Sequence, residues 1–412
     1  MGGNLDAPGA LAKGAPMAAR IIHVDLDAFF VEVCRQRHPE LRAVELLVVG
    51  GRRESRGVVQ SASYGARRYG IHAGMPIGQA VRLCPQATFF QGSFPHYREA
   101  SRAVRAVLQR HSPTVVMASL DEAYLDFAGT ERLYPVSLLP AAERLRDDTR
   151  RETGLDCSIG IGPNRMVAKL ASDAAKPRGL MEVRAGWEEG FLAGLALQAL
   201  PGIGPKTAAR LATLGLRDVY QIQTMTEAAL ERLIGAEART LKRRAHGHGG
   251  TTLSPGRLPR TMSRETTLSR DLRDPVELEA ILALLTARVA GQLREELLVA
   301  RTVTLKLRHD DFHTVTRRRT LPEATDLDAE LYGAARLLFR EAFEDVRRRD
   351  RGVRLIGVAA SNLGAAAEAD LFEPEERRRR RELSTAVDKV REKYGFGAVT
   401  PGAALQARRR ED

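Results

Sequence analysis

Cysteine is scarce in this chain, with three residues in a length of 412. Cys34, Cys84 and Cys157 lie far apart and form no Cys-x-x-Cys pair, which excludes a zinc knuckle and favours a reducing compartment. No apolar run approaches the roughly 18 residues of a membrane span. Residues 1–16 are rich in Gly, Ala and Pro and lack the apolar core of a signal peptide. We therefore expect a cytoplasmic protein without membrane contacts, with a disordered extension at residues 1–19 in which Met17 is an alternative start.

Acidic side chains are outnumbered, because 64 Lys and Arg face 52 Asp and Glu and leave a net charge of +12. This excess indicates a polyanionic partner, with nucleic acid as the leading candidate, although a solvated basic surface would give the same count. Hydrophobic residues make up 43% of the chain, enough for buried cores, and the length predicts about two to four domains.

Two acids interrupt an apolar stretch at residues 21–30. A buried carboxylate is costly unless it is paired or bound to a metal. The alternation of a β-strand places Asp25 and Asp27 on one face together with His23. The pattern predicts a cation site on this strand, for which Asp25 and Asp27 are equal candidates.

Residues 115–126 repeat the pattern of acids within an apolar run. Asp121 and Glu122 are adjacent, so they can reach one site only at a turn or a bulge. Oxygen ligands without a His or Cys cluster favour Mg²⁺, which binds through carboxylates and substrate phosphates. The alternative is that both stretches carry unrelated acids at strand ends in solvent.

Helical spacing at residues 100–109 and 141–151, and a strand pattern at 158–161, complete a β-α-β-β-α-β order. This order predicts a ferredoxin-like unit, in which the acids of the first strand and of the central hairpin can meet on one sheet. A further helix is expected at residues 164–175, where Pro177 and Gly179 end it.

Two other segments have the composition of phosphate sites. Residues 58–70 pass from strand to helix, and Tyr64 and Arg67 share one helix face, although an amphipathic surface helix would look similar. Residues 200–208 match a helix-hairpin-helix, in which Gly202 and Gly204 expose backbone amides to a DNA phosphate and Lys206 adds charge. The alternative for the second segment is an ordinary turn between helices.

Gly and Pro at residues 247–259 mark the clearest linker. Beyond it we expect helices at 275–296 and 327–343 and strands at 302–308, 313–320 and 353–360. The strands carry a group of basic residues that we expect to form one face of a sheet, which suits a phosphate backbone or guards an edge strand against aggregation. This group consists of Lys306, Arg308, Arg317, Arg318 and Arg319.

A series of motifs resembles those of the Y-family DNA polymerases, and most closely the bacterial DNA polymerase IV branch. In chain order they are His-Val-Asp-Leu-Asp-Ala-Phe-Phe (23–30), Tyr-Gly-Ala-Arg (64–67), Ser-Leu-Asp-Glu-Ala (119–123), Ala-Lys-Pro (175–177) and Gly-Ile-Gly (202–204). The resemblance extends from Met17 to Phe372.

The resemblance implies a multi-domain α+β fold, that of a right-hand polymerase. It implies a ferredoxin-like palm (20–30 and 95–183), small fingers (31–94), a helical thumb with the helix-hairpin-helix (184–250), a linker (251–262), an α+β little finger (263–362) and a C-terminal tail (363–412). The composition after Asn362 predicts that this tail is flexible, with a helix at residues 383–394.

The same resemblance implies roles for individual residues. Two Mg²⁺ ions would be bound by three carboxylates and the Leu26 carbonyl, and Asp27 would not be a ligand. Phe30, next to Phe29, would be the steric gate against the 2′ position of the sugar. The metal carboxylates would be Asp25, Asp121 and Glu122, and the triphosphate residues would be Ser61, Tyr64, Arg67 and Lys176.

The sequence departs from the family pattern at two positions. Cys34 stands where a Glu is common, which affects local packing. Residues 368–372 are similar to the family's sliding-clamp peptide, with Leu371 and Phe372 as its apolar anchor, but Glu368 stands where Gln is expected.

The expected function is template-directed addition of deoxynucleotides to a primer 3′-OH, in low-fidelity translesion synthesis without proofreading. The expected partners are primer-template DNA, an incoming dNTP and a sliding clamp, bound by a monomer. A two-metal nuclease is one alternative, but it needs neither a Phe gate nor Tyr64 and Arg67. A noncatalytic DNA-binding relative is the other, and it would not need all three carboxylates.

Overall fold

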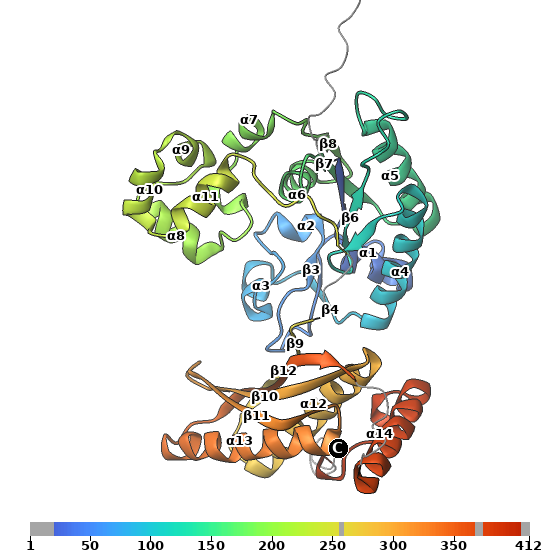
Figure 1. The fold of residues 1–412 in the computed structure, drawn as a ribbon, viewed down its shortest axis with the longest axis vertical. Coiled ribbons are helices and arrows are strands. Elements are labelled where there is room, and N and C mark those ends of the chain that lie inside the picture. The colour runs from blue at the N-terminus through green and yellow to red at the C-terminus, as the bar shows by residue number, and fades with distance from the viewer. Residues whose placement is uncertain (1–19, 255–258, 367–373, 405–412) are drawn as a thin grey trace, which may run out of the picture. The chain divides into compact units, whose positions relative to one another are not determined.

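The computed structural model describes residues 20–254, 259–366 and 374–404. The chain divides into two compact units (Figure 1). Apart from the short segments 54–57 and 76–78, the first unit extends to residue 255 and the second follows it. Each unit has its own hydrophobic core.

The first unit is built on a five-stranded sheet in the order β5-β6-β1-β7-β8. Strand β1 pairs antiparallel with β6 and with β7, and β5 pairs antiparallel with β6. This arrangement confirms the predicted ferredoxin-like order, to which β8 adds a parallel edge strand. The strands are β1 (Ile21–Leu26), β5 (Val115–Met117), β6 (Glu122–Asp126), β7 (Cys157–Gly162) and β8 (Leu180–Glu182).

The two faces of this sheet differ because β1 alternates. Ile22, Val24 and Leu26 lie in a core with side chains of α4 and α5, whereas Ile21 lies with Ala168 of α6. Asn164 caps α6, since its side chain accepts a hydrogen bond from Val167 N at 3.0 Å. The helices are α4 (Phe94–His111), α5 (Leu139–Thr153) and α6 (Arg165–Ala174).

A small subdomain lies between β1 and α4 in the chain. Its sheet has the order β3-β2-β4, and the Ser63 side chain caps α2 by accepting a hydrogen bond from Ala66 N at 3.3 Å. The expected strand-to-helix passage is therefore confirmed. The elements are α1 (Phe29–Arg37), η1 (Pro39–Leu41), β2 (Leu47–Val49), β3 (Ser61–Ala62), α2 (Tyr64–Arg67), α3 (Ile77–Leu83) and β4 (Thr88–Phe90).

A helical subdomain follows β8 and has a separate apolar cluster that includes Leu200, Leu211 and Leu230. Gly202 has a φ of 92°, a conformation that suits glycine, and Gly204 is the N-cap of α8. The helices are α7 (Glu188–Ala193), η2 (Leu197–Ala199), α8 (Pro205–Thr213), α9 (Val219–Thr224), α10 (Glu227–Ile234) and α11 (Glu237–Ala245).

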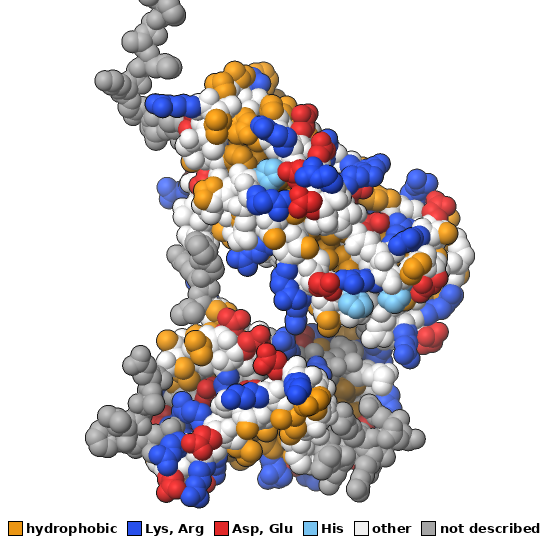
Figure 2. Space-filling model, turned by 90° about the vertical axis from the view of Figure 1, so that its right-hand side faces the viewer, with side chains coloured by type: hydrophobic (Ala, Val, Ile, Leu, Met, Phe, Trp, Pro, Cys, Tyr) orange, Lys and Arg blue, Asp and Glu red, His pale blue; other side chains and the backbone are white. Residues whose placement is uncertain are grey.

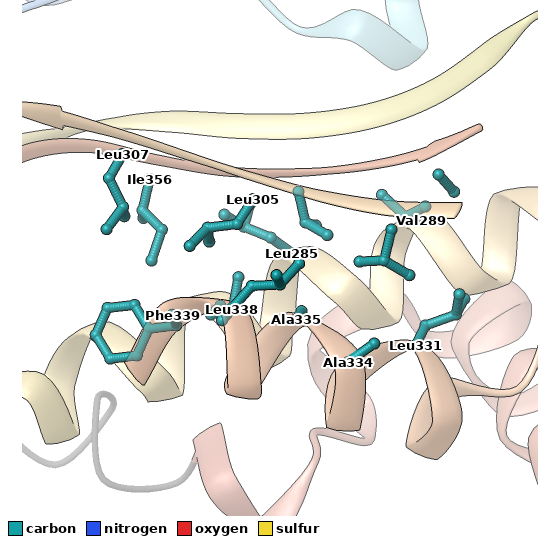
Figure 3. Close-up of a cluster of buried hydrophobic side chains, with 14 of the residues drawn as sticks. Leu285, Val289, Leu305, Leu307, Leu331, Ala334, Ala335, Leu338, Phe339 and Ile356 are labelled. Carbon is teal, nitrogen blue, oxygen red and sulfur yellow. The ribbon is translucent and has the colours of Figure 1, made fainter. Parts of the chain in front are cut away.

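The second unit is a four-stranded antiparallel sheet in the order β11-β10-β12-β9. Helices α12 and α13 pack on one face, where Leu285, Leu305, Leu338, Phe339 and Ile356 interdigitate (Figure 3). The predicted helices and strands are confirmed, but β9 was missed because its sequence is mostly polar and exposed. The elements are β9 (Thr261–Leu272), α12 (Pro275–Glu295), β10 (Leu298–His309), β11 (Thr314–Thr325), α13 (Asp328–Arg348) and β12 (Val353–Ala365).

The expectation of a flexible C-terminal tail is wrong for much of that segment, because it forms α14 (Glu375–Tyr394), η3 (Phe396–Ala398) and η4 (Gly402–Ala404). Ion pairs join α14 to the rest of the second unit. Arg294 of α12 has a side chain only 10% exposed and forms ion pairs with Asp388 at 2.6 Å and Asp328 at 2.9 Å. The sequence indicated a shorter helix, since charged contacts of this kind leave no apolar stripe to detect.

None of the helices described is both long and apolar enough to cross a membrane. Figure 2 shows Lys and Arg side chains interspersed with Asp and Glu on the face in view. The positive net charge is therefore not gathered into one broad patch on that face.

Candidate active site and nucleic-acid interface

The pairing of β1 with β6 brings the candidate carboxylates together. Asp25 lies opposite Glu122 in the antiparallel register, and Leu26 N donates to the Asp121 carbonyl at 2.9 Å. Asp121 lies in the turn before β6, so the chain bends where the sequence required a turn or a bulge. Asp25 on β1 and Glu122 on β6 thus lie on adjacent strands, and Asp121 lies in the turn that leads into β6.

Two lysines of the α6 region neutralise two of these acids. Lys176 Nζ lies 2.6 Å from Asp25 Oδ2, and Lys169 Nζ lies 2.6 Å from Glu122 Oε1. Lys176 also donates to Asp173 at 2.9 Å. Positive charge is therefore already provided at the acids, which lowers the cost of burying them.

The protonation of the two paired acids differs because their surroundings differ. Burial raises the pKa of Asp25 to about 6, although Lys176 acts in the opposite direction. His23 and Lys169 lower the pKa of Glu122 to about 2 against the effect of burial. Glu122 is therefore ionised throughout the neutral range.

His23 is completely buried behind Glu122. Its Nδ1 lies 2.7 Å from Ser172 Oγ, and its Nε2 faces Glu122 Oε2 at 3.8 Å. Burial lowers the pKa of His23, so the imidazole is neutral near pH 7.

The sequence analysis did not identify Lys169 as a residue of this site. Its spacing of seven residues from Lys176, two turns of a helix, was the available signal.

The donor set suits a hard divalent cation, because it consists of carboxylate oxygens with a backbone carbonyl beside them. Across the described part of the chain, no three His, Cys, Asp or Glu side chains are gathered closely enough to hold a metal ion. The carboxylate chemistry of the candidate ligands Asp25, Asp121 and Glu122 fits Mg²⁺. To close a coordination shell around one ion, these side chains would have to move closer together.

The candidate triphosphate residues lie on α2, on β3 and just after α6. Tyr64 OH donates to Asp27 Oδ1 at 2.9 Å, and the Arg67 guanidinium lies 5.0 Å from the centre of the Tyr64 ring. Burial and the charge of Asp27 raise the pKa of Tyr64 to about 12, so the phenol stays protonated. Ser61 lies on β3 and is buried.

The two adjacent phenylalanines have different surroundings. Phe29 is 1% exposed and belongs to the core, whereas Phe30 is partly exposed and its ring packs edge-to-face against Tyr97 at 4.8 Å. Only Phe30 can therefore meet a bound sugar without displacing the core. Cys34, the residue that departs from the family pattern, lies behind them with its Sγ 3.3 Å from Tyr97 OH.

The candidate DNA contacts form two surfaces, one in each unit. Gly202, Gly204 and Lys206 are exposed at the hairpin before α8, which Arg244 closes by donating to Pro201 O at 2.9 Å. These three residues are therefore available to a phosphate at a helix start.

The register of the second sheet divides the basic residues expected to act together. Arg318 lies opposite Thr304 and so shares a face with Lys306 and Arg308, away from the helices. Arg317 and Arg319 lie opposite the buried Leu305 and Val303 and belong to the other face, so the prediction of one basic face is wrong for these two. Lys306 is paired with Glu265 at 2.7 Å.

The remaining candidates, Leu371, Phe372 and Glu368, lie outside the described residues.

Comparison with known proteins identifies the family to which most of the chain is similar. Residues 24–173 match the impB/mucB/samB family, and residues 259–371 match the C-terminal domain of that family. The DNA polymerase IV of Caulobacter vibrioides is 39% identical over 392 residues, which cover 94% of each chain. The chain belongs to the Y family of DNA polymerases.

Other relatives support this assignment. The DNA polymerase IV of Dehalococcoides mccartyi strain CBDB1 is 38% identical over 383 residues, covering 93% of this chain and 97% of the relative. A solved Y-family polymerase chimera of Dbh and Dpo4 has a TM-score of 0.73 at 27% identity, covering 83% of this chain and 98% of the chimera. An insertion ternary complex of Dbh DNA polymerase has a TM-score of 0.55 with the same coverage and identity. This Y-family polymerase is a DNA-directed DNA polymerase, and it depends on a divalent metal.

Proposed function

We propose that this Y-family polymerase binds primer-template DNA and an incoming dNTP and joins the nucleotide to the primer 3′-OH with two Mg²⁺ ions. The observation that carries the proposal is the pairing of Asp25 with Glu122, with Asp121 in the adjoining turn. When bound, the ions would activate the 3′-OH and stabilise the charge on the departing pyrophosphate. Asp25, Asp121, Glu122 and the Leu26 carbonyl would hold them.

The residues around the carboxylates favour a nucleotide over a simple hydroxyl substrate. Lys176 lies within 2.6 Å of Asp25, so a triphosphate that approaches the acids meets its ammonium group. Tyr64 and Arg67 present a phenol and a guanidinium from α2, and Ser61 adds a hydroxyl nearby in sequence. Such groups stabilise negative charge that moves onto the leaving phosphates.

Phe30 would select the sugar. Its partly exposed ring is held from behind by Tyr97, so it cannot retreat from a 2′-hydroxyl. Phe29 is buried in the core and would support this position without meeting the sugar.

The assignment of 31–94 as fingers, 184–250 as thumb and 263–362 as little finger belongs to the same proposal. The hairpin at Gly202 and Gly204 would hold a DNA phosphate. The sheet face with Lys306, Arg308 and Arg318 would follow the backbone, and such contacts position DNA without reading its sequence. We also propose a monomer that copies with low fidelity without proofreading and is recruited to a sliding clamp by Leu371 and Phe372, with an affinity that Glu368 reduces.

Primer extension on a labelled primer-template, with and without Mg²⁺, tests the proposed activity. Asp121→Ala should abolish nucleotide addition while DNA affinity stays within a few-fold, because a metal carboxylate makes little contact with DNA. Asp147→Ala is a matched control, since this acid is exposed on α5 and its described ion pair is with the neighbouring Arg146. Shortening of the primer by the unaltered enzyme would indicate a nuclease, and loss of both activity and DNA binding in Asp121→Ala would make Asp121 structural.

A further inference from the structure

Asp27 is buried but does not serve the carboxylate pair beside it. It is 5% exposed, directly after β1, and its oxygens accept hydrogen bonds from three separate parts of the chain. Tyr64 OH donates to Oδ1 at 2.9 Å, and Ser158 Oγ lies 3.1 Å and 3.0 Å from the two oxygens. The backbone amide of Arg178 donates to Oδ2 at 2.9 Å.

These donors account for the burial of the acid. A carboxylate has about four acceptor positions, and a buried one is expensive unless they are filled. Among the described residues, no Lys, Arg or His forms an ion pair with Asp27, so hydrogen-bond donors stabilise its charge. Both of its oxygens are thereby occupied and are poor candidates for a metal, whereas at Asp25 the described donor, Lys176, contacts Oδ2 alone.

Two of the three donors, Tyr64 and Arg178, come from segments that carry candidate triphosphate residues. Tyr64 begins α2, and the Arg67 guanidinium stacks on its ring at 5.0 Å. Arg178 follows Lys176 by two residues in the turn after α6. Ser158 lies on β7, next to β1, and is the one donor that belongs to the sheet itself. Asp27 therefore links two nucleotide-binding segments to the strand that carries Asp25.

We propose that Asp27 is a positioning residue for the incoming nucleotide. It holds the Tyr64 phenol and the turn that contains Lys176 at fixed places relative to Asp25, so that the triphosphate pocket is formed before the nucleotide arrives. A pocket arranged in advance binds more tightly because less ordering is needed on binding. The inference rests on the proposed function, since it assigns the triphosphate to Tyr64 and Lys176.

Asp27→Asn tests the proposal in the full-length chain. The amide has the size of the carboxylate but only one accepting oxygen, so at least one of the donors loses its partner. With a dideoxy-terminated primer-template, we expect the Kd for the matched dNTP to rise roughly ten-fold, the effect of one lost hydrogen bond to a charged group. On an extendable primer, the maximal insertion rate and the DNA affinity should change less than about three-fold, because the lost contact affects nucleotide binding and not the chemical step.

A double-mutant cycle distinguishes positioning from general support. If Asp27 acts through Tyr64, the variant with both Asp27→Asn and Tyr64→Phe should raise the dNTP Kd no more than the larger single change. Ser158→Ala is the matched control, because it removes a donor from the same carboxylate without touching a nucleotide-binding segment. It should leave the dNTP Kd near that of the unaltered enzyme.

Several results would overturn the proposal. Additive effects in the cycle, an equal rise of the Kd in Ser158→Ala, or a fall in rate with an unchanged Kd would each assign Asp27 to the structure alone. If Asp27→Asn does not fold, Tyr64→Phe by itself decides, since an unaltered dNTP Kd means that the link to Asp27 has no role. Failure of the proposed function is distinguishable, because the unaltered enzyme would then neither bind dNTP nor extend a primer.

Discussion

Helix α6 packs closely on strand β7 at Gly160, and a substitution there tests whether this packing holds the site residues in place. A Cβ atom placed on Gly160 would lie 2.0 Å from Ala168 O and 2.2 Å from Ser172 N. Ordinary contacts begin at 3.4 Å, so the helix would have to retreat by about 1.4 Å, the difference between 3.4 and 2.0 Å. Because backbone atoms are in the way, Gly160→Ala should destabilise the protein by about 3 kcal/mol, the upper end for overpacking.

The same movement should affect function. Helix α6 carries Lys169, and Lys176 follows it, so a retreating helix lengthens their contacts of 2.6 Å with Glu122 and Asp25. We therefore expect Gly160→Ala to lower the efficiency of dNTP insertion even at temperatures where the protein is folded. Denaturant unfolding followed by circular dichroism gives the stability, and single-turnover insertion gives the activity.

Gly190→Ala provides the matched control in the same unit. Gly190 lies on α7, is exposed, and a Cβ atom there would meet nothing within 4 Å. Replacing a helical glycine with alanine in open space should stabilise by roughly 0.5–1 kcal/mol. Equal unfolding midpoints and equal insertion rates for the two variants would refute the account of close packing beneath α6.

The remaining predictions concern the sugar, the DNA backbone and the clamp. Phe30→Ala should raise ribonucleotide insertion with little loss of deoxynucleotide insertion, and unchanged discrimination would place the gate elsewhere. The slope of the logarithm of duplex affinity against the logarithm of salt concentration should become less steep by about 0.9, the value for one phosphate, in Arg318→Ala. In Arg340→Ala, on helix α13, the slope should stay unchanged. If both have the same slope as the unaltered enzyme, this sheet face does not hold DNA. Alanines at Leu371 and Phe372 together should weaken binding to a bacterial sliding clamp in a titration, and equal binding would remove that site.

The sequence by itself determined the faces of β1, the helices α12 and α13 and the family, because these depend on residues that are close together along the chain. Alternation in β1 places Ile22, Val24 and Leu26 in the core and leaves His23 and Asp25 on the opposite face. The apolar periodicity of α12 and α13 marked both helices, since each buries one face against a sheet. The order of the motifs indicated the family, and the family models and relatives that match most of the chain then showed it.

The sequence patterns of the polar strand β9 and of the exposed helix α14 were weaker indications of secondary structure. Strand β9 lacks an apolar alternation and is recognised only through its pairing with β12. Helix α14 has no buried residue and is held by ion pairs such as that of Asp388 with Arg294, which lie 94 residues apart in sequence. Periodicity cannot detect a contact of this kind, because neither partner changes the local pattern.

Tertiary structure alone decided the partners of the buried charges. Asp27 and Asp25 are indistinguishable by strand alternation, yet Asp25 meets a lysine and Asp27 meets neutral donors from positions 37, 131 and 151 residues away. Cross-strand register likewise decided that Arg318, and neither Arg317 nor Arg319, shares a face with Lys306 and Arg308. A carboxylate or a guanidinium acts through whatever the fold places within about 3 Å of it, the reach of a hydrogen bond, and that distance is set by the packing of segments remote in sequence.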